Sequence, residues 1–355
     1  MIRLALIGYG RAGRTFHAPL IRATPGLEIA VVASSRPETV RADLPQVRIV
    51  PSAEDVWADA SVDVAVIATP TATHVALAAA AIEAGKHVVV DKPLADSLEG
   101  ARRLGALASR TGRLLTTFQN RRWDGDFMAL ESIVRDGILG EATHVESHFD
   151  RYRPAVRDRW RERPGPGSGV WNDLGPHLAD QALRLFGLPD WVNGSLAAHR
   201  TSGLVDDWAH VILGYPRRVV ILHASMLAAA PAPRFVAHGS RASWIKYGVD
   251  AQEARLAAEM GLDAGPPPHE RAILVDGPTG IETDTVVPPG DYRRFYAALR
   301  DAVHGDGDNP VPPAQAIATT AVVESAARSA KERRAVALAL TDEERAAAAP
   351  AALES

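Results

Sequence analysis

The six residues Gly8-Tyr9-Gly10-Arg11-Ala12-Gly13 constrain the fold of this chain more than any other stretch. They follow an apolar run, Ile2 to Ile7, that is typical of a buried strand, and they precede Arg14 to Ala23, which is long enough for a helix. In such a unit the first glycine permits a tight turn, the second lets a pyrophosphate approach the backbone, and the third lets helix and strand pack closely. The phosphates then meet the positive end of the helix. The motif therefore predicts a dinucleotide site contacted by Gly8, Gly10, Arg11, Ala12 and Gly13.

Strands and helices are expected to alternate up to about residue 121. Apolar runs at 27–33, 47–50, 62–68, 86–90 and 114–118 are typical of buried strands, and the segments around 53–58, 72–84 and 97–109 are typical of helices. Regular alternation at this spacing indicates a parallel sheet. We therefore predict a doubly wound Rossmann domain over residues 1–121.

The end of the second expected strand bears on the choice of dinucleotide. The run Leu27 to Ala33 is followed by Ser34-Ser35-Arg36, where an NAD-preferring domain usually carries an acidic residue for the ribose 2′-hydroxyl. Two hydroxyls and a guanidinium can instead bind a 2′-phosphate through charge-assisted hydrogen bonds. We predict that NADP is preferred over NAD and that Ser34, Ser35 and Arg36 contact it; the alternative is a solvated loop arginine.

Asp91-Lys92-Pro93 ends the expected strand at 86–90, because proline bars further pairing. Ligands of doubly wound domains lie outside the carboxyl ends of the parallel strands, so Lys92 is expected to face the cofactor cleft. We predict a catalytic and cofactor-contacting lysine, with a plain surface lysine as the alternative. Thr69, Pro70 and His74 follow the neighbouring strand and are predicted cofactor contacts as well, although a histidine in a first helical turn is often only solvated.

Composition excludes several classes of function. The formal net charge is −4, and polyanion binding needs a positive excess, so nucleic acid is not an expected partner. The absence of cysteine excludes disulfides, thiolate metal sites and cysteine nucleophiles. The N-terminus lacks the features of a signal peptide, and no apolar run approaches the ~18 residues of a membrane span. We expect a cytoplasmic protein without a membrane partner.

Residues 122–340 are expected to form a second domain of a different kind. Short alternating runs at 143–150, 208–215, 219–225 and 235–238 have few helices between them, which indicates an open, mostly antiparallel sheet in an α+β domain. A last helix at about 314–333 could pack back on the first domain. The alanine-rich residues 341–355 are predicted to be a flexible tail.

One face of the run at 143–150 carries His144, Glu146, His148 and Asp150. Imidazole and carboxylate groups are metal ligands. Two-residue alternation alone, however, would also produce a polar sheet face or a subunit contact. We favour the second interpretation, so no metal site is predicted and a homodimer or homotetramer formed through this sheet is expected.

A helix is predicted from Asp173 to Gly187, with Asp173 as N-cap, Pro176 in the first turn and Gly187 as C-cap. The i,i+4 spacing lets Asp173 lie next to His177. A carboxylate beside an imidazole orients the ring and keeps its proton near neutral pH, which suits acid–base chemistry on an alcohol or carbonyl. The alternative is a capped helix with a solvated histidine. The arginine-rich segment 151–163 just before it could bind a polar substrate or only form ion pairs.

The glycine motif, the Asp91-Lys92-Pro93 tripeptide and the Asp173-x-x-x-His177 pair, in this order and spacing, resemble the Gfo/Idh/MocA oxidoreductases. Three further motifs are similar to the NADP-dependent scyllo-inositol dehydrogenase branch: Phe16-His17-Ala18-Pro19, Asn120-Arg121-Arg122-Trp123-Asp124 and Glu146-Ser147-His148-Phe149-Asp150-Arg151. Asp91 stands where the family usually has glutamate, and Gln119 where many relatives have histidine or tyrosine.

The resemblance implies a Rossmann domain, a second domain with an open sheet, and Lys92, Asp173 and His177 at the substrate. Asn120, Arg122 and Trp160 are expected substrate contacts. The implied reaction is hydride transfer between NADP(H) and a carbinol carbon of a cyclic polyol or sugar, with scyllo-inositol and scyllo-inosose as the expected pair. The alternatives are a reductase of another sugar or carbonyl substrate, since one fold hosts varied chemistry, and a catalytically silent NADP-sensing regulator.

Overall fold

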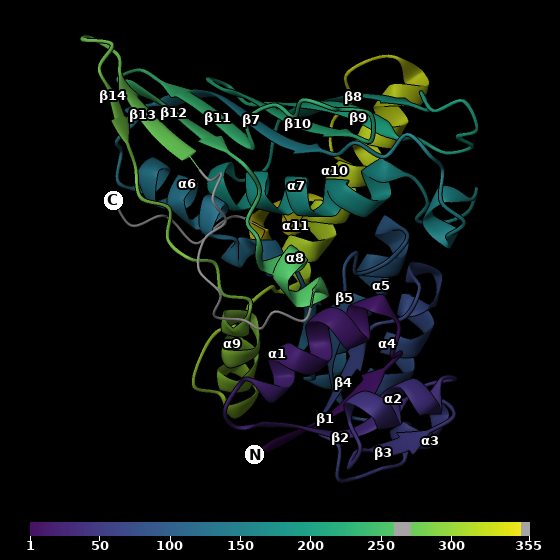
Figure 1. Cartoon of the computed structure of the whole chain (residues 1–355). Helices are drawn as coiled ribbons and strands as arrows, with labels where there is room; N and C mark the ends of the chain where they lie inside the picture. Colours follow the sequence, from purple (N-terminus) through teal and green to yellow (C-terminus); the bar gives the residue numbers. More distant parts are fainter. Residues whose placement is uncertain (259–270, 349–355) are drawn as a thin grey trace. The chain divides into compact units, whose positions relative to one another are not determined.

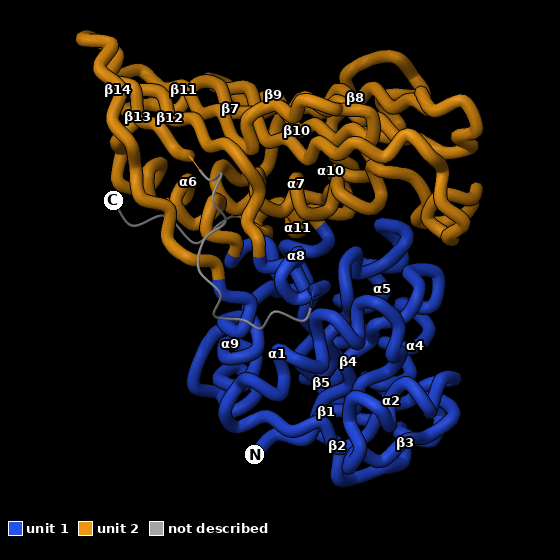
Figure 2. Tube along the Cα trace, viewed as in Figure 1, with its two compact units in different colours: residues 1–123, 252–263, 291–317 blue, residues 124–251, 264–290, 318–355 orange. Residues whose placement is uncertain are grey.

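The computed structural model describes residues 1–258 and 271–348. The chain divides into two compact units, each described here by itself (Figure 2). Unit 1 holds Met1–Trp123 together with α8 (Gln252–Ala257) and Asp291–Ile317, and unit 2 holds most of the remainder. The first boundary lies close to the expected residue 121. The return of two later segments to unit 1 differs from the contiguous domains expected from the sequence.

Gln252 shows why the late segments belong to unit 1. Its side-chain amide donates a hydrogen bond to the carbonyl of Trp123 at 3.0 Å, and its oxygen accepts one from the backbone N–H of Tyr292 at 2.8 Å. Phe295 and Leu299 are fully buried in the core of the same unit. Apolar burial and hydrogen bonds to distant residues thus complete unit 1, and neither is visible in local sequence patterns.

Unit 1 is built on a six-stranded parallel sheet in the order β3-β2-β1-β4-β5-β6 (Figure 1). The strands are β1 (Ile2–Ile7), β2 (Leu27–Ala33), β3 (Arg48–Val50), β4 (Val64–Ile67), β5 (His87–Asp91) and β6 (Leu115–Phe118). This is the Rossmann strand order, and it confirms the predicted fold class. The order reverses between β1 and β4, which is where dinucleotides bind in such sheets.

The helices between the strands of unit 1 follow the predicted alternation. They are α1 (Ala18–Arg22), α2 (Pro37–Asp43), α3 (Glu54–Trp57), α4 (His74–Glu83) and α5 (Leu98–Thr111), and the later segments add α8 and α9 (Arg293–His304). The start of α5 agrees with its sequence, because the Ser97 side chain accepts a hydrogen bond from the N–H of Gly100 at 3.2 Å. The helix expected after the glycine motif is less regular, since Gly13–His17 is a π-helical turn that leads into α1.

Unit 2 is built on an eight-stranded sheet in the order β14-β13-β12-β11-β7-β10-β9-β8. Its strands are β7 (Ala142–Asp150), β8 (Trp191–Ala197), β9 (Trp208–Gly214), β10 (Val219–Ser225), β11 (Phe235–Gly239), β12 (Ala242–Tyr247), β13 (Arg271–Asp276) and β14 (Glu282–Asp284). All neighbours are antiparallel except β7 and β10, which confirms the mostly antiparallel sheet.

Three helices cover one face of this sheet: α6 (Gly125–Arg135), α7 (Val170–Phe186) and α10 (Pro313–Glu332) (Figure 1). Trp171 of α7 is fully buried and donates from its indole nitrogen to the carbonyl of Val323 of α10 at 3.0 Å. Among residues 124–251 and 271–348, no helix covers the opposite face, which we call the outer face. Along each strand, side chains on the outer face alternate with side chains that are buried in the core.

The start of α7 differs from the prediction. Gly169, with φ of 92°, is the N-cap, and the helix begins at Val170, three residues before the expected Asp173. Asp206 explains the earlier start, because its carbonyl accepts from Val170 N at 2.8 Å and its carboxylate accepts from Trp171 N at 2.7 Å. Asp173 is therefore in the first turn rather than at the cap, and Pro176 lies inside the helix; the predicted end at Gly187 is confirmed.

The C-terminal segments also differ from expectation. Only the first turn of α10, up to Ile317, belongs to unit 1; beyond it, Ser329 accepts a hydrogen bond from Gly194 of β8 at 2.9 Å. The predicted flexible tail begins with α11 (Asp342–Ala347), which is stabilised by a capping box between Thr341 and Glu344. Residues 349–355 of that predicted tail lie outside the described residues. None of the described helices is long and apolar enough to cross a membrane.

Candidate active site

The glycine motif forms the turn that its spacing predicts. Gly8 has φ of 95°, and a Cβ there would lie 2.8 Å from the carbonyl oxygen of Ala68. A Cβ on Gly13 would lie 2.2 Å from the carbonyl oxygen of Gly8, so both positions require glycine. A Cβ on Gly10, in contrast, would meet no atom within 4 Å. The turn is therefore tightly packed on the protein side and open at Gly10, where a pyrophosphate must approach the backbone, so these residues fit a dinucleotide.

Residues from β2 and β4 lie at the same edge of the sheet as this turn. A Cβ on Gly8 would lie 3.0 Å from Cγ2 of Thr69, which places the loop after β4 against the glycine turn. After β2, the Ser34 hydroxyl accepts a hydrogen bond from the N–H of Arg36 at 3.0 Å, and the side chains of Ser35 and Arg36 are exposed. The hydroxyls of Ser34 and Ser35 and the guanidinium of Arg36 thus belong to a short loop at the carboxyl end of β2.

Arg11 has a protein partner that the sequence did not reveal. Its guanidinium pairs with Glu253 of α8 at 3.2 Å, although the Arg11 side chain stays 60% exposed. Glu253 also pairs with the buried Arg121. The carboxylate therefore joins α8 to both the glycine turn and the end of β6. Ala12 packs against the core of unit 1 and has no polar group to offer a phosphate beyond its backbone.

His74 requires a correction. The side chain is 1% exposed, so it is neither solvated nor open to a ligand. Its Nδ1 lies 2.8 Å from the carbonyl oxygen of Pro93, and its Nε2 lies 2.9 Å from that of Thr69. Because both ring nitrogens already face backbone oxygens, His74 joins the loops after β4 and β5 instead of contacting the cofactor directly. It positions Thr69 and the Lys92–Pro93 segment.

Lys92 lies at the carboxyl end of β5, as predicted, and a buried polar cluster lies behind it. The Asp91 carboxylate accepts a hydrogen bond from the N–H of Lys92 at 2.9 Å and lies 4.0 Å from Nε2 of His17. The other ring nitrogen of His17 lies 2.6 Å from the hydroxyl of Tyr296 in α9. Sequence analysis quoted His17 only as part of a motif, and nothing local could indicate that it reaches both Asp91 and Tyr296.

The burial of His17 predicts a pH dependence of stability. Burial lowers the pKa of His17 to about 4, from 6.5, and the nearby Asp91 carboxylate offsets this only in part. Below pH 6.5 His17 is protonated in the unfolded chain but stays neutral in the folded chain. The free energy of unfolding therefore falls as the pH drops from about 6.5 toward 4, by about 3 kcal/mol from His17 alone. In His17→Asn we expect a smaller loss of unfolding free energy between pH 7 and pH 4.5, measured by urea denaturation.

The control for this experiment is His304→Gln, because His304 is exposed at the end of α9. Its stability should fall with pH as steeply as that of the unmodified chain. An equally steep fall in His17→Asn would mean that His17 is not the group responsible.

The end of β6 gives a second correction. Arg122 is 5% exposed, and its guanidinium donates to the carbonyl oxygen of Pro310 at 3.0 Å, so it ties this segment to the loop before α10. We therefore reassign Arg122 from substrate contact to structural support. Asn120 is 6% exposed and begins the same short 3₁₀ turn, which ends at Trp123. Its role at the substrate stays a prediction.

In unit 2, Asp173 and His177 lie one turn apart on α7, and His177 is 5% exposed. Asp173 forms an ion pair with Arg161 at 3.2 Å, and the Arg161 guanidinium stacks 4.3 Å from the centre of the Trp160 ring. Within the arginine-rich segment, Arg159 likewise pairs with Glu162 at 2.7 Å. Both arginines thus form ion pairs, and Trp160 packs against the guanidinium that pairs with Asp173. The predicted contact of Trp160 with the substrate stays a prediction.

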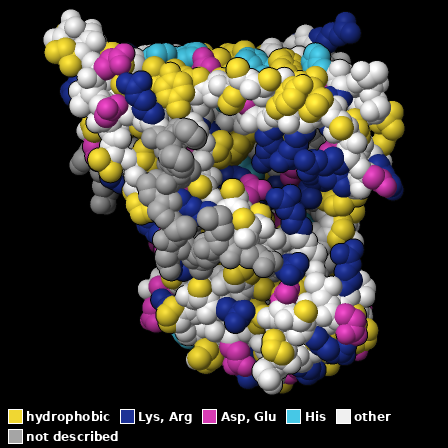
Figure 3. Space-filling view, viewed as in Figure 1, with side chains coloured by type: hydrophobic (Ala, Val, Ile, Leu, Met, Phe, Trp, Pro, Cys, Tyr) yellow, Lys and Arg dark blue, Asp and Glu magenta, His cyan; other side chains and the backbone are white. Residues whose placement is uncertain are grey.

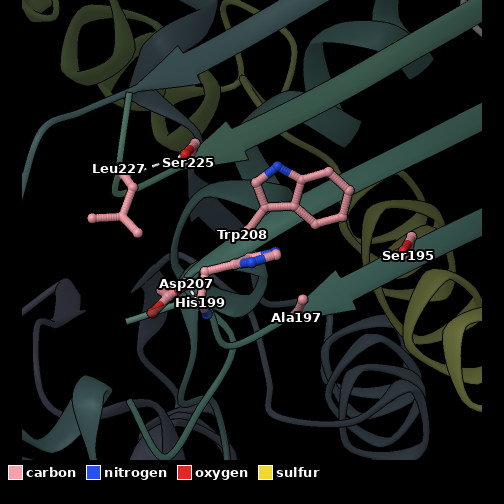
Figure 4. Close-up of a pocket in the computed structure, with 7 residues that line it drawn as sticks. All are labelled: Ser195, Ala197, His199, Asp207, Trp208, Ser225 and Leu227. Atoms are coloured by element: carbon pink, nitrogen blue, oxygen red, sulfur yellow. Dashed lines mark hydrogen bonds between the residues drawn. The ribbon is translucent and has the colours of Figure 1, made fainter. Parts of the chain in front are cut away.

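A separate hollow of about 520 Å³ lies at the end of β8, β9 and β10 (Figure 4). The Trp208 and His199 rings meet edge to face there, with centres 5.6 Å apart, and Asp207 accepts a hydrogen bond from His199 N at 2.8 Å. None of the site residues predicted from the sequence lines it. The lining residues are Ser195, Ala197, His199, Asp207, Trp208, Ser225 and Leu227.

Comparison with known proteins decides the family. A model described as an oxidoreductase family with an NAD-binding Rossmann fold matches residues 2–119, and the GFO/IDH/MocA C-terminal domain model matches residues 127–245. The chain belongs to the Gfo/Idh/MocA oxidoreductase family. It is therefore a dehydrogenase or reductase with a nicotinamide-dinucleotide-binding domain, as the resemblance implied.

Relatives within the family cover almost the whole chain. The uncharacterized oxidoreductase YdgJ of Escherichia coli is 51% identical over 95% of this chain and 99% of its own length. The NADP(+)-dependent scyllo-inositol 2-dehydrogenase IolW of Bacillus subtilis is 32% identical over 95% of this chain and 96% of its own. A crystal structure from Klebsiella pneumoniae has a TM-score of 0.92 and 47% identity, covering 98% of this chain and 99% of that chain.

Proposed function

We propose that this oxidoreductase transfers a hydride between NADP(H) and a carbinol carbon of a cyclic polyol, with scyllo-inositol and scyllo-inosose as the substrate pair. The observation that carries the cofactor choice is the Ser34-Ser35-Arg36 loop at the end of β2, which offers hydroxyls and a guanidinium in place of a carboxylate. The similarity to IolW over 95% of the chain supports the substrate class.

The glycine turn and the loops after β2 and β4 would hold the dinucleotide, which supplies the hydride acceptor or donor when bound. Gly8, Gly10 and Gly13 shape the turn, and backbone N–H groups there can bind phosphate oxygens. His74 keeps the loop after β4 in register with the loop that carries Lys92. Rigid support of this kind is what a reaction sensitive to small displacements needs.

We assign the proton chemistry to Lys92 and to the Asp173–His177 pair. The Lys92 ammonium would stabilise the negative charge that develops on the reacting oxygen. His177 would exchange the hydroxyl proton, with Asp173 one helical turn away to orient it. Arg161, in contact with Asp173, would fix that carboxylate. Lys92 could itself be the proton donor, because an ammonium group carries exchangeable protons.

A substrate screen tests the proposal directly. The purified enzyme is assayed with scyllo-inositol, other inositols, their inososes and aldoses, each with NADP(H) and NAD(H), by following absorbance of the reduced cofactor. We expect the highest kcat/KM with the scyllo pair and NADP(H). A higher kcat/KM with a linear aldose would show that the proposed substrate is wrong and that the enzyme acts on an aldose. Tight NADPH binding without turnover of any polyol would favour an NADP-sensing regulator.

Replacing Arg36 tests the cofactor choice. In Arg36→Ala we expect the KM for NADPH to rise roughly 10- to 100-fold relative to that for NADH, because a charge-assisted hydrogen bond to the 2′-phosphate contributes about 1.5–3 kcal/mol. The measurement is steady-state kinetics with both cofactors. Arg41→Ala is the control, since Arg41 is an exposed arginine in α2 paired with Glu38. An unchanged KM ratio in Arg36→Ala would contradict the NADP preference.

A further inference from the structure

The outer face of the unit 2 sheet gathers histidines from several strands. In the register of the parallel pair, His223 of β10 lies opposite His148 of β7, and in the antiparallel pair His210 of β9 lies opposite His223. The side chain of Asp150 follows on the same face as His148. Figure 3 shows histidine side chains beside hydrophobic ones along the upper margin of the view, where this sheet lies. The sequence showed only the β7 members of this group.

Three of these side chains converge. One ligand atom from each of His148, Asp150 and His223 lies within 4.8 Å of the others. Nε2 of His223 is 3.5 Å from Oδ1 of Asp150, close to the ~3.3 Å between two ligands of a tetrahedral zinc ion with bonds of about 2.0–2.1 Å. The side chain of His148 is 12% exposed, that of Asp150 5% and that of His223 15%, so the cluster is largely shielded from water.

Two polar atoms of these side chains make no hydrogen bond within the part of the chain that the structure describes. Nδ1 of His148 and Oδ1 of Asp150 are buried and make no hydrogen bond. Unpaired buried polar atoms cost free energy, and an uncompensated buried carboxylate oxygen costs more than a neutral group. A cation between them would remove both costs. This is the observation that separates the cluster from an ordinary polar sheet face.

The remaining nitrogen and oxygen atoms of the three side chains already contact other polar groups of the protein, as the outer atoms of ligands in known metal sites do. Nε2 of His148 bonds Oε2 of Glu146 at 2.8 Å, and Nδ1 of His223 lies 3.4 Å from Nδ1 of His210. The second oxygen of Asp150 accepts from the N–H of Ala232 at 3.0 Å. A carboxylate or similar acceptor on the far nitrogen fixes the ring and its tautomer, so that the near nitrogen presents its lone pair to a metal.

We propose that His148, Asp150 and His223 form a binding site for one divalent transition-metal ion of the zinc type on the outer face of the sheet. Two imidazoles and one carboxylate suit such an ion better than Ca²⁺ or Mg²⁺, which prefer oxygen ligands. Glu146 and His210 are positioning residues. The site ties β7 to β10, the parallel pair in the middle of the sheet, and it revises the expectation from the sequence that no metal is bound.

The test uses the full-length chain without an affinity tag, stripped with EDTA and dialysed. Isothermal titration with ZnCl₂ should give one site per chain with micromolar or tighter affinity, and CoCl₂ should give visible absorption bands typical of four- or five-coordinate Co²⁺. His223→Gln and Asp150→Asn should each weaken Zn²⁺ binding at least about 100-fold through loss of a ligand, and Glu146→Gln should weaken it roughly 10- to 100-fold. Circular dichroism checks that each variant is folded.

The matched control is His238→Gln, because His238 is an exposed histidine of β11 on the same face, bonded to Ser243 and outside the cluster. Its Zn²⁺ affinity and Co²⁺ spectrum should equal those of the unmodified chain. Absence of Zn²⁺ binding in the unmodified chain would overturn the proposal. So would unchanged affinity in both His223→Gln and Asp150→Asn, or an equal loss in His238→Gln, which would indicate diffuse binding by surface histidines.

Discussion

Replacing Lys92 with methionine is expected to reduce kcat by about 100-fold to 1,000-fold, because one preorganised donor to a developing negative charge contributes on that order. Methionine keeps an unbranched side chain of similar length but removes the charge. Affinity for NADPH, measured by fluorescence titration, should change little, since the glycine turn and the loop after β2 are intact. This combination separates a catalytic lysine from one that only helps to bind the cofactor.

The control is Lys331→Met, because Lys331 is an exposed lysine near the end of α10. It should have normal kcat and KM. Lys92→Arg keeps a positive charge but changes its position and shape, so it should recover only part of the activity. Full activity in Lys92→Met would show that the proposed role is wrong.

Replacing His177 with alanine is expected to lower kcat about 100-fold to 10,000-fold, the usual contribution of a general acid–base group. NADPH binding should again be spared. The pH profile of kcat/KM adds a readout that a structural role would not move: its shape should change in His177→Ala. If the profile keeps its shape while activity falls, the proton travels through Lys92 instead.

Asp173→Asn is the companion to this variant. It preserves the size of the side chain but weakens the attraction to Arg161, which lies 3.2 Å away. We expect a smaller loss of kcat than in His177→Ala, because an orienting group acts through the imidazole. His304→Gln, at the exposed end of α9, serves as the histidine control and should retain full activity.

Several features of the molecule could be predicted because their causes are local. The glycine turn follows from three positions that cannot carry a Cβ or that must stay open to a phosphate. The cap of α5 follows from Ser97, whose hydroxyl bonds an N–H three residues away. The parallel sheet follows from the alternation of apolar runs and helices. The family itself follows from the order and spacing of the glycine turn, Lys92 and the Asp173–His177 pair.

The errors arose where a distant residue decides the outcome. The true start of α7 depends on Asp206, 36 positions after Val170, because its backbone and carboxylate bind the first N–H groups of the helix. His74 was predicted as a cofactor contact, but the carbonyl of Pro93 occupies one of its ring nitrogens. Arg122 was predicted to reach the substrate, but its guanidinium bonds Pro310, far along the chain.

By itself, the sequence determined the architecture of the Rossmann unit and the residue types of the Ser34 to Arg36 loop, since these rest on short-range geometry and on backbone conformations that few residues allow; the residues on which catalysis depends stay a prediction. Only the tertiary structure decided which polar groups are already paired and which remain available. The register of β7, β9 and β10 brings His148, His210 and His223 together. Strand register is set by packing across the whole sheet, and a pattern read along one strand does not contain it.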